Sequence, residues 1–137
     1  MMNKIQQLYL AAFLGLGLGL GAATPALAGD IYVISNPGIH VSGEEVREIF
    51  LGEKQFSGSV KIVPVDNTAA QADFLTKVLK MDVAKYNTSW TKKAFRDGLT
   101  PPVSKSSDAD VISFVKATPG AVGYVSTKPE SGVVQKY

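Results

Sequence analysis

Hydrophobic residues after residue 29 fall into short runs and periodic stripes that predict alternating strands and helices. Continuous apolar runs, typical of strands that are covered on their faces, occupy residues 31–34, 61–65, 121–125 and 133–134. Pro64 lacks a backbone N–H, which predicts an edge position or a bulge at that point of its strand. Four stripes at helical spacing contain Val46, Ile49 and Phe50; Phe74, Leu75, Val78 and Leu79; Val83, Tyr86, Trp90 and Ala94; and Val111, Ile112 and Val115.

Polar residues mark the expected helix starts. Ser42 with Glu45 and Thr68 with Gln71 have the spacing of capping boxes, and the other two helices are expected to begin after Asp82 and Ser107. Residues 96–106 contain Gly98, Pro101 and Pro102 and are predicted to form a loop. The order β-α-β-α-α-α-β-β predicts an α/β fold, a mixed β-sheet flanked by helices, with Trp90 in its core.

The first 28 residues differ in composition from the rest of the chain. Lys4 gives a positive start, residues 8–21 carry no charge, and Ala26-Leu27-Ala28 is a small-x-small cleavage sequence. This order predicts a signal peptide over residues 1–28, because the apolar stretch is shorter than the roughly 20 residues of a membrane span. We therefore expect one domain over residues 29–137, free in the periplasm. The chain has no cysteine, which excludes disulfides and thiol catalysis.

Positive and negative charges nearly cancel over the expected mature domain, but they are unevenly distributed along it. Only Lys4 among the 14 basic residues precedes residue 29, so the expected mature domain, with 12 acidic residues, is close to neutral. This balance argues against nucleic-acid binding, which needs a basic excess. Acidic residues prevail over residues 30–73 and basic residues over 77–105. The basic segment is either a solvated helix face or a docking face for an acidic partner or an anionic ligand.

Catalytic and metal chemistry find little support in the sequence. His40 is the only histidine and lies beside the turn at Pro37-Gly38, where a lone histidine is usually a surface residue. No H-E-x-x-H, P-loop or G-x-G-x-x-G motif occurs. Asp108 and Asp110 stand at a helix start, where capping and the helix dipole explain them. We expect a protein that is not an enzyme and that holds neither a metal nor a cofactor.

One segment has the pattern of an anion-binding site. Residues 65–71 lead from a strand end into a helix start, where free N–H groups and the helix dipole attract anions and where α/β sheets bind ligands. Asp66 would repel an anion, and an ordinary helix capped by Thr68 is the alternative. A second strand end is expected close by, so the candidate oxyanion-binding residues are Ser35, Asn36, Asn67, Thr68, Ala69, Ala70 and Gln71.

Two segments resemble the substrate-binding proteins of phosphate ABC transporters. Residues 41–52, V-S-G-E-E-V-R-E-I-F-L-G, resemble that family's helix ending in I-F-L-G, and residues 115–125, V-K-A-T-P-G-A-V-G-Y-V, resemble its V-x-x-T-P-G-A-I-G-Y-V segment. Phe74, Trp90 and Phe95 fall at similar relative places. The resemblance implies a periplasmic-binding-protein fold, whose full-length members close two lobes on a tetrahedral oxyanion and deliver it to a membrane permease.

The chain departs from this family in two respects. It has the length of a single lobe, so a second copy in a homodimer or a partner protein would have to complete the cleft. Its turn lacks the arginine and both glycines of the family's R-S-D-G-S-G-T and keeps only a hydroxyl, at Thr68. The resemblance implies a periplasmic solute-binding protein for phosphate or a related oxyanion, feeding or sensing for an ABC transporter. The alternative is an interaction or signalling module, docking on a permease or another envelope protein, that no longer binds phosphate tightly.

Overall fold

A computed structural model of the chain describes residues 29–137, so the predicted signal peptide lies outside the described residues. The elements alternate as the hydrophobic pattern predicts, with two additions, a short hairpin and a further strand. In chain order they are β1 (Tyr32–Ser35), α2 (Glu45–Phe50), β2 (Phe56–Ser57), β3 (Val60–Lys61), β4 (Val63–Asn67), α3 (Gln71–Phe74), the π-helical η1 (Leu75–Leu79), α4 (Val83–Asp97), β5 (Val103–Lys105), α5 (Asp108–Ala117), β6 (Ala121–Val125) and β7 (Val133–Lys136).

The strands form one mixed sheet, which confirms the predicted α/β fold. Five strands lie in the order β5-β4-β6-β1-β7. The strands β5, β4 and β6 run parallel, whereas β1 is antiparallel to both of its neighbours, β6 and β7. The first strand of the described chain therefore pairs with the last two. The short strands β2 and β3 form a separate hairpin.

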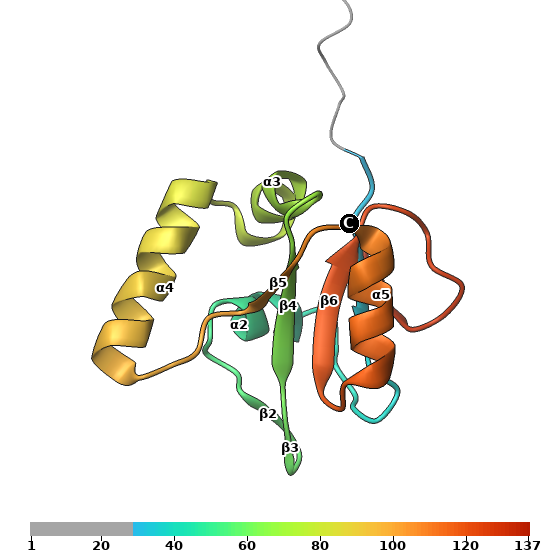
Figure 1. Cartoon of the computed structure of the whole chain (residues 1–137), viewed down its shortest axis with the longest axis horizontal. Helices are drawn as coiled ribbons and strands as arrows, with labels where there is room; N and C mark the ends of the chain where they lie inside the picture. Colours follow the sequence, from blue (N-terminus) through green and yellow to red (C-terminus); the bar gives the residue numbers. More distant parts are fainter. Residues whose placement is uncertain (1–28) are drawn as a thin grey trace, which may run out of the picture.

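Helices cover both faces of the sheet. Helix α5 packs on one face against alternate residues of β1, β4 and β6. The other face is covered by α2, α3, η1 and part of α4, and Figure 1 shows α4 and α5 on opposite sides of the sheet. Three aromatic rings lie at the centre of this second layer. Phe74 stacks on Tyr124 with ring centroids 3.8 Å apart, and Phe50 meets both rings edge-on.

Two of the predicted helix caps are confirmed. The Asp82 side chain accepts a hydrogen bond from the backbone of Lys85, and the Ser107 side chain accepts one from the backbone of Asp110. Trp90 is buried as predicted, and its indole N–H donates to the carbonyl of Phe50 at 3.0 Å. These contacts fix where α4 and α5 begin and how α4 is attached to the core.

The predicted capping box at Thr68 is wrong. Helix α3 begins at Gln71, and Ala70 before it offers no side-chain cap. The Asn67 side chain accepts from the Ala69 backbone instead, while the Thr68 N–H donates to the carbonyl of Lys105. The buried Asn67 side chain thus orders the turn before α3, and α3 itself has no side-chain cap.

The predicted loop over residues 96–106 contains the edge strand β5, which was missed. It pairs only with Val65, Asp66 and Asn67, so its three residues are ordered by β4 and not by a pattern of their own. Pro64 lies just before this pairing begins and faces a neighbouring strand on one side only, at Val122. The local edge position predicted for the proline is therefore confirmed.

We expect Gly120→Ala to destabilise the chain far more than Gly58→Ala. Both glycines have positive φ, which costs an alanine about 1–2 kcal/mol. A Cβ at Gly120 would also collide with the backbone carbonyl of Lys61, whereas a Cβ at Gly58 meets nothing within 4 Å. Urea unfolding should show a loss of about 3 kcal/mol or more for Gly120→Ala. Equal losses in the two variants would contradict the close approach of β3 to the start of β6.

Candidate functional site

The carboxyl ends of β4 and β6 meet at one edge of the sheet, where α/β folds bind ligands. Four polar residues from separate segments gather there: Asn67, Asp108, Ser126 and Thr127. Asn67 ends β4, Asp108 begins α5, and the other two follow β6. The sheet order places β4 beside β6, so residues far apart in sequence form one cluster.

Asn67 is fully buried and uses both ends of its side-chain amide. Its Nδ2 donates to Asp108 Oδ1 at 2.7 Å and to the Tyr124 carbonyl at 3.1 Å. Its Oδ1 accepts from the Ala69 N–H at 3.1 Å. This candidate residue therefore links β4 to α5, β6 and the turn before α3, and its donors point to protein atoms.

The Asp108 carboxylate receives the hydrogen bonds that a bound oxyanion would receive. The backbone N–H groups of Ser126 and Thr127 donate to it at 3.0–3.2 Å, and the Ser126 hydroxyl donates at 2.9 Å. Partial burial raises the pKa of Asp108, but the hydrogen bonds from Ser126, Asn67 and Thr127 outweigh it and hold the pKa below its ordinary value. An internal carboxylate thus occupies an anion-binding arrangement at this edge.

The turn before α3 is more open. Thr68 and Ala69 are exposed, Gln71 is half-buried and Ala70 is buried. The N–H groups of Thr68, Ala69 and Ala70 already donate to Lys105, to the Asn67 side chain and to the Asn67 carbonyl. What the turn can offer a ligand is the Thr68 hydroxyl, the Gln71 side chain and the start of α3.

The expectation that Ser35 and Asn36 lie beside this turn is wrong. Because β1 runs antiparallel to β6, Ser35 pairs with Val122 at the start of β6, at the opposite edge of the sheet. Asn36 is buried there, and its Nδ2 donates to the carbonyls of Val115 and Lys116 at 2.9 and 3.2 Å. It therefore satisfies the last turn of α5, while Ser35 donates its N–H to the Gly132 carbonyl.

Asp66 lies behind this edge, buried on the other face of the sheet. Its two carboxylate oxygens accept from the hydroxyls of Tyr86 at 2.9 Å and Tyr124 at 2.8 Å. Burial raises the pKa of Asp66 above its ordinary value of 3.8, although the two hydrogen bonds oppose this effect. The sequence indicated only a charge that would repel anions, whereas the structure shows an internal tie between β4, β6 and α4.

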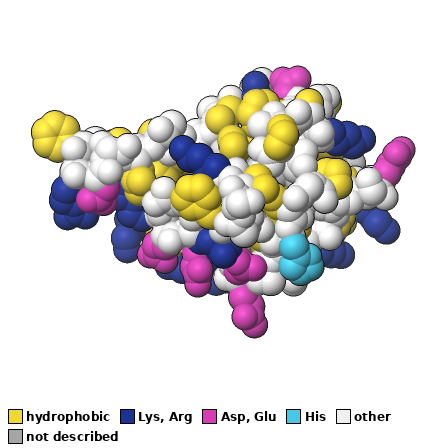
Figure 2. Space-filling view, turned by 90° about the horizontal axis from the view of Figure 1, so that it is seen from below, with side chains coloured by type: hydrophobic (Ala, Val, Ile, Leu, Met, Phe, Trp, Pro, Cys, Tyr) yellow, Lys and Arg dark blue, Asp and Glu magenta, His cyan; other side chains and the backbone are white. Residues whose placement is uncertain are grey.

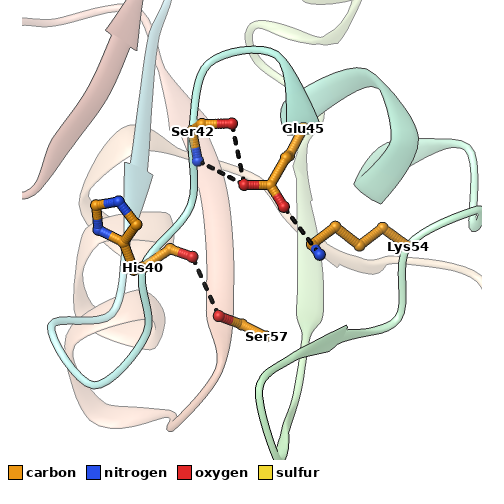
Figure 3. A network of polar contacts seen from close by, with 5 residues as sticks. All are labelled: His40, Ser42, Glu45, Lys54 and Ser57. Atoms are coloured by element: carbon orange, nitrogen blue, oxygen red, sulfur yellow. Dashed lines mark hydrogen bonds and ion pairs between the residues drawn. The ribbon is translucent and has the colours of Figure 1, made fainter.

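The single histidine lies outside this cluster. Figure 3 shows the His40 carbonyl accepting from Ser57, beside the network of Ser42, Glu45 and Lys54 at the start of α2. Lys54, 2.9 Å from Glu45, and the hydrogen bonds from Ser42 lower the pKa of Glu45 to about 2. The serine and glutamate predicted as a capping box contact each other, with the serine N–H and hydroxyl both donating to Glu45. The predicted cap is nevertheless wrong, because α2 begins at Glu45 and no side chain caps it.

Comparisons with known proteins do not assign the chain to a family. No protein-family model matches the chain, and a search of the curated proteins finds no relative. The resemblance to phosphate-binding proteins therefore stays a prediction.

Within residues 29–137, no three His, Cys, Asp or Glu side chains gather as a metal site would require. Among the helices of the same residues, none has both the length and the hydropathy of a membrane span.

We expect the Asp66 carboxyl to make the chain less stable as the pH rises. With its pKa raised in the fold, the folded state keeps a proton that the unfolded chain loses near 3.8, so the free energy of unfolding falls through this range. The native chain should therefore lose stability relative to Asp66→Asn between pH 4 and 8 in urea unfolding. Asp73→Asn is the control, and a constant difference across this range would contradict the expectation.

We also expect Asp108→Ala to create an anion-dependent protein. Loss of the carboxylate leaves the donors of Asn67, Ser126 and Thr127 without their acceptor, at a cost of about 1–3 kcal/mol in urea unfolding. Acetate or phosphate should restore part of this loss, about 1.4 kcal/mol at ten times the dissociation constant. Asp110→Ala, at an exposed carboxylate two residues further along α5, is the control at equal ionic strength. Equal responses of the two variants to anions would refute the arrangement.

Proposed function

We propose that this chain is an exported solute-binding lobe of the phosphate-binding type, which works in the periplasm as half of an oxyanion-binding cleft. The observation that carries the proposal is the turn Thr68–Gln71, which exposes Thr68 and Ala69, follows a parallel strand and leads into a helix. The resemblance of residues 41–52 and 115–125 to phosphate-binding proteins supports it. So does the α/β architecture, which presents the turn at the edge where such sheets bind ligands.

The lobe alone offers an oxyanion few partners. The donors of Asn67, Ser126 and Thr127 are held by Asp108, whose negative charge repels a second anion. The turn is open to water, and tight binding of phosphate needs nearly complete burial with every oxygen satisfied. We therefore propose weak binding by the single lobe, and tight binding only where a second body, such as a permease, an envelope protein or another copy, closes over the turn.

The expected result is a phosphate dissociation constant of about 1 mM or weaker, which corresponds to about −4 kcal/mol. Titration of the ¹⁵N-labelled chain with phosphate should shift the amide signals of Thr68–Gln71. Replacement of Thr68 by alanine should reduce the shifts, and Ser35→Ala, at the opposite edge of the sheet, should leave them unchanged. Sodium chloride at matched ionic strength corrects for screening, and an absence of shifts at the turn would exclude the binding function.

A second candidate function is favoured by the Asp108 contacts. A lobe whose strand-end donors are filled by its own carboxylate needs no solute to be stable, which suits a module that docks on another envelope protein. This reading expects no phosphate-dependent shift at Thr68–Gln71. The same titration therefore separates the two functions, since only the solute-binding lobe responds at the turn.

A further inference from the structure

Helix α4 is attached to the body by a narrow face and leaves its other faces uncovered. Only Tyr86 and Trp90 are buried among its 15 residues. Phe95 is 94% exposed, although Ala94 beside it is half-buried. A phenyl ring that is almost fully exposed on a well-formed helix is apolar surface that a partner can bury.

Basic side chains lie beside this ring on α4. Lys85, Lys92 and Arg96 are spaced by seven and four residues, which places them on one side of the helix, and all three are exposed. We call them the basic patch. Arg96 contacts only its neighbour Asp97, at 3.7 Å and in solvent, and such a pair contributes little. The positive charges of the basic patch are therefore exposed to solvent.

An acidic patch lies next to it, before, on and after α2. It consists of Glu44, Glu48 and Glu53, which are all exposed, whereas Glu45 is paired with Lys54. Helices α2 and α4 are neighbours, because Trp90 donates to the Phe50 carbonyl and Lys93 to the Leu51 carbonyl. Figure 2 shows Lys and Arg side chains gathered below a projecting hydrophobic side chain, with Asp and Glu side chains beside them on the same face.

A hollow lies where the ends of α2 and α4 approach each other. It has a volume of about 170 Å³, and its lining includes Ile49 and Gly52 at the end of α2, Trp90 of α4, and Leu99 in the segment after α4. A cavity of about 150 Å³ accommodates benzene, so the hollow has room for a phenyl ring. Phe95 and the hollow lie at the same end of α4, since Gly98 ends this helix and also lines the hollow.

We infer that this face binds a second copy of the chain in a two-fold arrangement, with Phe95 of each copy in the hollow of the other and each basic patch against the partner's acidic patch. A two-fold axis makes every contact twice, which requires a knob, a hollow and both charges on one surface. This chain carries the four on α2, α4 and the segments that adjoin them. The inference stands without the proposed function, because none of these residues belongs to the turn Thr68–Gln71.

Charge favours a second copy over the other occupants of such a face. An anionic membrane would attract the basic patch but be repelled by Glu44, Glu48 and Glu53 beside it. A purely acidic protein would meet the same repulsion. A second copy satisfies both patches at once, and the near-neutral sum of charges over residues 29–137 leaves little long-range repulsion between copies.

The test is sedimentation velocity of the exported chain over a range of concentrations, without phosphate. We expect a dimer that weakens as salt rises, because salt screens exposed charges. Three variants should each raise the dissociation constant of the dimer at least about tenfold. They are Lys92→Glu with Arg96→Glu, Glu48→Lys with Glu53→Lys, and Phe95→Ser. Lys116→Glu with Lys128→Glu makes the same change of charge elsewhere and should leave the dimer intact, as should Val133→Ser for the loss of an exposed apolar side chain.

Mixing supplies the decisive result. The two charge-reversed variants repel themselves, but a mixture of them restores both attractive contacts and should form a heterodimer. The control mixture combines the Glu48→Lys, Glu53→Lys variant with the Lys116→Glu, Lys128→Glu variant. Its components have the same net charges as those of the first mixture, but it should form no heterodimer. Circular dichroism confirms that each variant is folded. A monomeric native chain at all concentrations, a dimer indifferent to Phe95→Ser, or an unrestored mixture would overturn the inference. Each outcome is independent of phosphate binding, so the two proposals fail separately.

Discussion

A buried carboxylate held by two tyrosine hydroxyls determines how the parts of this lobe fit together. Asp66 comes from β4, Tyr124 from β6 and Tyr86 from α4. Taking the charge out of water is costly, and in the described part of the chain no cation pairs with Asp66, so the two hydroxyls offset only part of that cost. Tyr124 also stacks on Phe74. The same contacts therefore attach α4 to the sheet and set which of its faces remain uncovered.

Successive residues of β4 send their side chains to opposite faces of the sheet, and each face receives a different polar tie. Asp66 meets the tyrosines in the layer of α2, α3 and α4, whereas Asn67 reaches Asp108 at the start of α5. Asp108 in turn collects the donors after β6. A free anion that competes for these donors competes with a carboxylate on the same chain, whose effective concentration is far higher. The contacts that stabilise this edge of the sheet therefore disfavour the binding of a ligand there.

Most of the longer elements and the caps at Asp82 and Ser107 were readable from the sequence, because each depends on neighbours within a few residues. Strand β5 was not, since its three residues are ordered by pairing with β4 and follow two prolines. The placement of Ser35 and Asn36 failed because the sequence does not state that β1 runs antiparallel to β6. Asp108 was correctly placed at a helix start, but its contact with Asn67 joins residues 41 positions apart. Such a contact follows from sheet order, which no local pattern encodes.

The pairing of β1 has a consequence for how the protein is made. Its neighbours in the sheet are β6 and β7, at the far end of the chain, and Ile31 exchanges both backbone hydrogen bonds with Tyr137. Folds that rest on such distant contacts form slowly, and here β1 has no partner in the sheet until residues 121–137 have been delivered. The export proposed for this chain would benefit from this order, because the sheet closes only after residues 121–137 have arrived.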